Sequence, residues 1–203
     1  MSDQALIPAA KTDQLSCLKY IYESTKRWPF NIASYVAMSG SLECTKYVLD
    51  NGAPLDEIMM YEAAFRGHFD LLKYLAEKGR KMNVQVCIGA AGSNRLYILR
   101  WARAQNCPWT YSTVHTAARY NRVDALKYLI DNGCETNIMI MATASLEGSL
   151  DCLKYLHENG YEWSKSVDYN DCNSAAQGGH LPSLIYCHEN GCKLWSILRI
   201  RLE

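Results

Sequence analysis

Residues 63–75 read AAFRGHFDLLKYL, and parts of this segment recur along the whole chain. The segment holds a pair of small residues, a glycine-histidine turn and an apolar-Lys-Tyr-apolar tetrapeptide at residues 72–75. This tetrapeptide, or a close variant, brings an aromatic residue to positions 20, 47, 74, 101, 128 and 155, a constant step of 27 residues. The seventh aromatic residue is Tyr186, after a longer step of 31 residues. A constant step of this length indicates a repeat protein.

Two further positions keep the same phase along the chain. A pair of small residues lies eleven positions before each aromatic residue, as in Ala63-Ala64 and Ala117-Ala118. A helix-stopping residue, most often glycine, lies five positions after it. Together these positions predict seven repeats and a short tail, with the boundaries 2–29, 30–56, 57–83, 84–110, 111–137, 138–164, 165–194 and, for the tail or cap, 195–203.

The spacing inside one repeat predicts two short helices. In the third repeat, residues 58–65 have helical periodicity, and an amphipathic stretch runs from Phe69 to Lys78 before Gly79 ends it. Helices of about ten residues are marginal alone, so stacking must supply the core. The predicted fold is therefore all-α, a solenoid of seven stacked helix-turn-helix repeats in one domain over residues 1–194. The extra residues of the seventh repeat lie within 164–171, and we interpret them as a loop insertion rather than a partial finger.

These motifs resemble the ankyrin repeat, whose core reads Thr-Pro-Leu-His-x-Ala-Ala-x-x-Gly-His. Residues 112–118 (STVHTAA) and the Gly-His turns at 67–68 and 179–180 carry the resemblance. The repeat is six residues shorter than the family's 33, and the missing part corresponds to the β-hairpin finger. The compact form is similar to repeats of giant DNA viruses, amoebae and oomycetes, which raises a virus-encoded or host-manipulating role as one interpretation.

The resemblance implies a protein-interaction module, an adaptor or scaffold that holds a partner on the concave face made by the first helices. The residues that follow the small pair vary in chemistry from repeat to repeat, as a recognition surface on a repeated scaffold requires. Aromatic residues and arginine are enriched at interface hot spots. The alternative is that they are ordinary surface residues. The expected partner-binding residues are Tyr61, Phe65, Arg66, Tyr111, Arg119, Tyr120 and Glu147.

Charge is balanced over the chain, with 21 basic and 21 acidic residues, but it is unevenly distributed. Residues 78–123 carry eight basic side chains and no acidic one, and this basic band predicts a partner with an acidic surface. Nucleic acid or another polyanion is the alternative partner. We expect Trp101 in the core aromatic position and Trp109 in a loop position, so neither is free to stack on a base. The band includes Arg80, Lys81, Arg95, Arg100, Arg103 and Arg122.

The cysteines and histidines predict no chemistry of their own. All nine cysteines fall at repeat positions, several of them shared with leucine or methionine, and there is no Cys-x-x-Cys pair. His68 and His180 fit the Gly-His turn, and there is no glycine-rich phosphate loop. We expect neither an enzyme nor a cofactor or metal site. The absence of a secretory signal or a membrane span predicts a reducing compartment, the cytoplasm, or the cytoplasm or nucleus of a host cell if the protein is viral. We also expect a monomer.

Overall fold

The computed structural model describes residues 3–164 and 170–193, and it divides into two compact units, one up to Pro108 and one from Trp109. The described residues form fourteen helices and no strand, which confirms the all-α prediction. The first unit contains α1 (Asp3–Lys11), α2 (Leu15–Thr25), α3 (Ile32–Ser39), α4 (Leu42–Asp50), α5 (Glu57–Arg66), α6 (Phe69–Glu77), α7 (Val84–Gly92) and α8 (Leu96–Ala104). The second unit contains α9 (Tyr111–Arg119), α10 (Val123–Asp131), α11 (Ile140–Leu146), α12 (Leu150–Glu158), α13 (Asp171–Gln177) and α14 (Leu181–Glu189).

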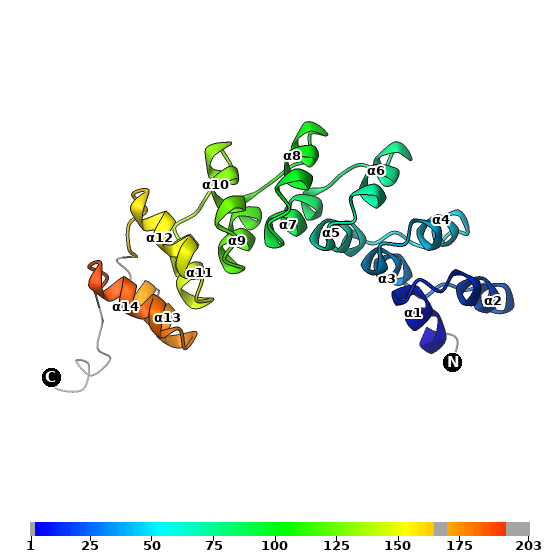
Figure 1. The fold of residues 1–203 in the computed structure, drawn as a ribbon, viewed down its shortest axis with the longest axis horizontal. Coiled ribbons are helices and arrows are strands. Elements are labelled where there is room, and N and C mark those ends of the chain that lie inside the picture. Colours follow the sequence, from blue (N-terminus) through cyan, green and yellow to red (C-terminus); the bar gives the residue numbers. More distant parts are fainter. Residues whose placement is uncertain (1–2, 165–169, 194–203) are drawn as a thin grey trace. The chain divides into compact units, whose positions relative to one another are not determined.

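The helices follow one another in pairs, and the pairs stack (Figure 1). Within each unit the first helices of successive pairs lie side by side, which we call the first-helix row: α1, α3, α5 and α7 in the first unit, and α9, α11 and α13 in the second. Neighbouring first helices contact each other more extensively than neighbouring second helices do. The first-helix row is therefore the narrower, inner side of each unit.

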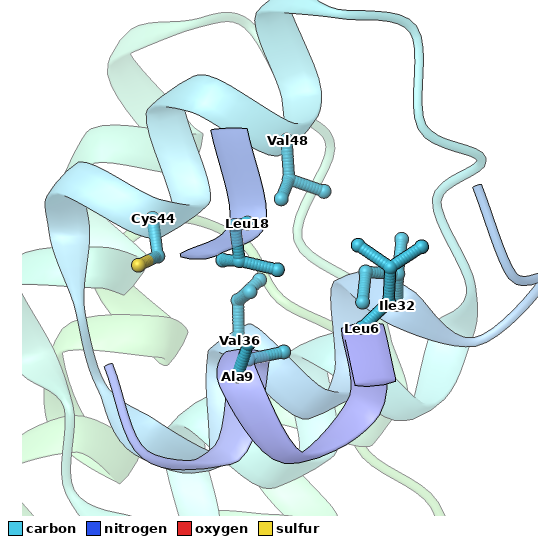
Figure 2. Close-up of a cluster of buried hydrophobic side chains, with 8 residues drawn as sticks. Leu6, Ala9, Leu18, Ile32, Val36, Cys44 and Val48 are labelled. Carbon is cyan, nitrogen blue, oxygen red and sulfur yellow. The ribbon is translucent and has the colours of Figure 1, made fainter. Parts of the chain in front are cut away.

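The core lies between the two helices of a pair and between successive pairs. In the first unit, Leu6 of α1 and Leu18 of α2 are fully buried against Ile32 and Val36 of α3 (Figure 2). Cys44 and Val48 of α4 complete this cluster. Burial of an aliphatic side chain contributes about 1.5–3 kcal/mol, and the same repeat positions supply it in every pair. Because this cluster draws on residues of two successive pairs, stacking of the pairs contributes to the core.

The small pair allows neighbouring first helices to approach closely, and the approach is tightest between α5 and α7. Ala63, Ala64, Ala90 and Ala91 are all fully buried. A Cβ atom on Gly89 would lie 2.5 Å from the backbone oxygen of Tyr61 and 3.0 Å from the backbone nitrogen of Phe65. A side chain at this position of α7 would therefore force the two helices apart, and glycine allows their backbones to pack directly against each other.

The aromatic position is not part of the core, and this part of the sequence prediction is wrong. Tyr20 is 75% exposed, and the equivalent Trp101 is only partly buried, edge-on to Phe69 with ring centroids 5.3 Å apart. The ring lies on the second helix, facing the previous pair rather than the interior.

The lysine before the aromatic residue covers the ring of the next pair. This contact, which we call the lysine-tyrosine ladder, occurs four times. The ammonium-to-ring distances are 5.5 Å for Lys19–Tyr47, 5.8 Å for Lys46–Tyr74, 5.1 Å for Lys127–Tyr155 and 5.8 Å for Lys154–Tyr186.

A tryptophan in the loop between pairs forms a second link. Trp28 stacks on Tyr22, 4.1 Å between ring centroids, and its Nε1 donates a 3.0 Å hydrogen bond to the backbone oxygen of Asn51 at the end of α4. In the second unit, the Nε1 of Trp163 donates a 2.8 Å hydrogen bond to the oxygen of Asn190, the equivalent position after α14. Unpaired carbonyls at a helix end require such donors. These links connect successive pairs.

The cysteines behave as small apolar residues, as expected, with one exception. Eight of the nine thiols are buried, all nine are free, and only Cys17 is exposed. Cys44 and Cys152, at the same repeat position, contact the preceding pair through Asp13 and the backbone oxygen of Ala117. Cys17, at the same repeat position on α2, is exposed.

Candidate functional site

The first-helix row carries equivalent side chains on the face that is turned away from the second helices. In the first unit this face of α5 presents Tyr61 and Phe65, whose rings stack with centroids 5.5 Å apart. In the second unit the equivalent positions on α9 are His115 and Arg119, and Tyr111 lies one turn earlier. The spacing of four residues puts these side chains on one helix face, because α-helical neighbours recur at i and i+4.

The Tyr61–Phe65 stack is held in place by its own backbone. Gly89 of α7 packs against the carbonyl of Tyr61 and the amide of Phe65, which leaves the two rings on the surface of α5. Both rings are partly buried. Arg66, the next predicted residue, forms an ion pair with Glu62 on the same helix, with 2.9 Å between Nε and Oε2. The first unit therefore offers a preordered aromatic pair beside a cation whose charge is already partly balanced.

The second unit offers a polar pocket between α9 and α11. It has a volume of about 230 Å³, and two of the predicted residues, Tyr111 and Arg119, line it. Arg119 also forms an ion pair with Glu147, with 3.1 Å between Nε and Oε1, so the structure brings these three predicted residues together. Tyr120 is exposed at the end of α9 and does not line the pocket. The full lining is Tyr111, Ser112, His115, Thr116, Arg119 and Thr143.

His115 also lines the pocket, although the sequence pattern did not predict it as a site residue. Its Nε2 lies 2.8 Å from Asn137 Oδ1 and its Nδ1 lies 3.0 Å from Thr143 Oγ1. Burial lowers the pKa of His115 below its ordinary value, the hydrogen bond with Asn137 acts in the opposite direction, and the charge of Arg119 lowers the pKa further. The neutral ring is therefore favoured, and with Nε2 protonated it donates to Asn137, while Nδ1 faces the Thr143 hydroxyl, which itself donates a 2.9 Å hydrogen bond to the backbone oxygen of Met139. Both nitrogens are occupied, so His115 shapes the pocket rather than serving as a base.

The histidines of the Gly-His turns have structural contacts, too. His68 Nε2 lies 3.3 Å from the backbone oxygen of Met38, and its ring covers Gly40, which has a φ of 75°. A Cβ on Gly40 would overlap the His68 ring, and a Cβ on Gly148 would overlap His180 in the same way. Each histidine thus packs on the turn of the preceding pair. In the described residues no group of three or more His, Cys, Asp or Glu is arranged to hold a metal ion.

The residues of the basic band are divided between the two units. Five of its six predicted residues lie in the first unit and Arg122 lies in the second. Arg80 and Lys81 lie in the loop before α7, whereas Arg95, Arg100 and Arg103 are on or next to α8, a second helix. Arg103 donates a 3.2 Å hydrogen bond to the oxygen of Cys107, and so closes its own loop. The described helices include none that is both long and apolar enough to cross a membrane.

Stacked helix pairs with a varied face on the first helices define a helical repeat protein. A family model described as ankyrin repeats (many copies) matches residues 32–76, and one described as ankyrin repeat matches residues 111–138. Among 95 matching solved chains, the human ASB11 ankyrin repeat domain has a TM-score of 0.58 and 16% identity, over 94% of this chain and 99% of that one. A search of curated proteins found no match. Residues 32–76 and 111–138 are thus ankyrin repeats, and the chain has the fold of an ankyrin repeat domain, as the motifs predict.

Proposed function

We propose that this protein is a non-catalytic interaction module, an adaptor or scaffold, that holds a partner protein on its first-helix row. One observation carries the proposal: equivalent positions on a closely packed row of helices present a different chemistry in each unit. Those positions hold an aromatic stack on α5, and a histidine-arginine pair beside a pocket on α9. A rigid scaffold with variable surface residues gives specificity at low cost in conformational entropy.

A pull-down from cell lysate tests this proposal, with nuclease present and absent. The bait is the full chain, compared with Phe65→Ala and Arg119→Ala variants, and with Lys81→Ala as a control in an exposed loop. We expect the same protein partners with and without nuclease, and their loss from both first-helix variants but not from the control. Unchanged partners in the Phe65 and Arg119 variants would exclude the first-helix row as the binding surface.

Binding of nucleic acid or another polyanion through the basic band is the second candidate. Residues 78–123 carry positive charge only, which favours a polyanion. The position of Arg95, Arg100 and Arg103 on or next to a second helix argues against a shared surface with the first-helix row. Titration with random duplex at several salt concentrations discriminates the two, because polyanion binding weakens steeply with salt.

The nine free thiols also support a reducing compartment, and we propose the cytoplasm, or the cytoplasm or nucleus of a host cell if the chain is viral. We further propose that the protein acts as a monomer. Light scattering of the purified chain, with a reductant present, measures its mass and tests the last point.

A further inference from the structure

The pocket between α9 and α11 has one charged group in its lining. Arg119 supplies that charge, and its Nε lies 3.1 Å from Oε1 of Glu147. Its two terminal amino groups have no acceptor among the residues that the structure describes. Arginine presents such groups as a planar fork that matches two oxygens of one carboxylate.

Apart from Tyr111 and the hydroxyl of Ser112, the other polar side chains of the pocket are hydrogen-bonded. Both nitrogens of His115 are hydrogen-bonded, and the hydroxyl of Thr116 donates a 2.8 Å bond to the oxygen of Ser112. Tyr111 is 53% exposed at the mouth, and its hydroxyl has no partner within the described residues. The pocket therefore offers a guanidinium and a phenol to an incoming acceptor. The carboxylate of Glu147 leaves little net positive charge beside Arg119, and a site of this kind suits a monoanion better than a phosphate dianion.

An exposed apolar group lies next to this polar pocket. Ile138 is 90% exposed directly before α11, at the repeat position that Tyr111 occupies in the previous pair. Its neighbour Asn137 contacts His115 at 2.8 Å and accepts a 2.9 Å hydrogen bond from the amide of Met139, which fixes this corner to the pocket wall. Single exposed apolar residues are common, but here Ile138 stands beside an unfilled polar pocket.

We propose that this pocket binds the carboxylate of an Asp or Glu side chain from a partner protein, while Ile138 and Tyr111 cover an apolar side chain close to it in the same segment. The proposal rests on the proposed function, because it names the chemistry of the partner that the first-helix row holds. The two oxygens of the carboxylate accept hydrogen bonds from the two terminal amino groups of the Arg119 guanidinium. The Tyr111 hydroxyl donates a further hydrogen bond to the same carboxylate. Glu147 limits the affinity, since it competes for the same guanidinium.

The test starts with a displayed library of random short peptides selected on the full chain. A selected peptide is then synthesised in three forms: unchanged, with its acidic residue replaced by the amide, and with phosphoserine in its place. We expect selected peptides to contain Asp or Glu near a large apolar residue. The amide form should bind about tenfold more weakly or worse, and the phosphoserine form should bind no better than the acid.

Three protein variants locate the effect. Arg119→Gln should weaken the acidic peptide about tenfold while leaving the affinity for the amide form nearly unchanged. Glu147→Gln should strengthen the acidic peptide about two- to five-fold, a gain that a folding defect cannot produce. Arg80→Gln makes the same change in net charge in the first unit and should have no effect.

The outcomes separate the inference from the proposed function. Peptides whose binding depends on the first-helix row but is unaffected by the acid-to-amide change, or is strongest for phosphoserine, would overturn the carboxylate pocket alone. Peptides whose binding is unaffected by Arg119→Gln, by Glu147→Gln and by Phe65→Ala would overturn both.

Discussion

The ammonium nitrogen of Lys127 on α10 lies 5.1 Å from the centroid of the Tyr155 ring on α12, one pair further along the chain. The equivalent lysine and tyrosine meet at three other places within the two units. The Lys-Tyr dipeptide that sets the repeat phase thus takes part in contacts between pairs. Each lysine contacts the tyrosine ring of the next pair and not the tyrosine beside it in the sequence.

Replacing Lys127 by Met should lower the free energy of unfolding by about 0.5–1 kcal/mol, the usual strength of an exposed cation–π contact. Urea denaturation of the wild type, Lys127→Met, Tyr155→Leu and the double variant measures the coupling energy. Lys81→Met, in an exposed loop, is the matched control. A coupling energy of zero would show that the contact does not stabilise the stack.

Gly89→Ala should destabilise the protein by about 1–3 kcal/mol, because the added methyl group would meet the carbonyl of Tyr61 at 2.5 Å. The usual effect of this substitution inside a helix is the opposite, a gain of about 1 kcal/mol. Thermal unfolding decides the sign. A higher melting temperature would mean that α5 and α7 separate at little cost, and the Tyr61–Phe65 stack would then not be rigidly placed.

Thiol reactivity should be confined to one residue. Burial raises the pKa of Cys44 to about 11 and that of Cys152 to about 12, and a thiol in that state reacts slowly because the thiolate is the nucleophile. With an aromatic disulfide reagent at pH 8, we expect one fast-reacting thiol, Cys17, and eight that react only when the protein opens. The Cys17→Ser variant should lose the fast phase; if a fast phase persists, a second thiol is accessible.

Stability should fall on mild acidification because of His115. Its pKa is lower in the folded protein than the value of about 6.5 expected for the unfolded chain. As the pH falls below about 6.5, the unfolded state therefore binds a proton more readily than the folded state does. The free energy of unfolding decreases until the pH is below the pKa of the folded state, where both states are protonated. Urea midpoints between pH 8 and pH 5 measure this loss. His115→Gln should show a shallower decline, and an identical decline in the variant would assign it to other groups.

Much of the fold could be predicted from the sequence. The small pair, the turn glycines and the apolar positions of each pair recur with one phase, so helix pairs and a shared core follow directly from them. The aromatic position was predicted wrongly because periodicity places Tyr74 or Trp101 on the apolar flank of a helix but not at a given depth. A ring that faces a neighbouring lysine gives the same pattern as a ring in the core.

The candidate site was less predictable, since it depends on contacts between pairs. The varied positions of α5 and α9 are visible in the sequence, and Phe65 and Arg119 are found there. The pocket also needs Asn137 and Thr143 from the next pair, and their hydrogen bonds to His115 require the helices to be in place. His115 is at the same repeat position as Tyr61, so the helix face of His115 could be predicted from the sequence. Its hydrogen-bond partners could not.

Site-specific photo-cross-linking tests the central claim most directly. A photoreactive phenylalanine replaces Phe65 and Tyr120 near the first-helix row, and in separate variants Tyr20 and Leu181 on the second helices, both well exposed. After irradiation in nuclease-treated lysate, we predict that the same partner protein is cross-linked from positions 65 and 120, and not from positions 20 and 181. Cross-links from positions 20 and 181, with none from 65 and 120, would contradict binding on the first-helix row.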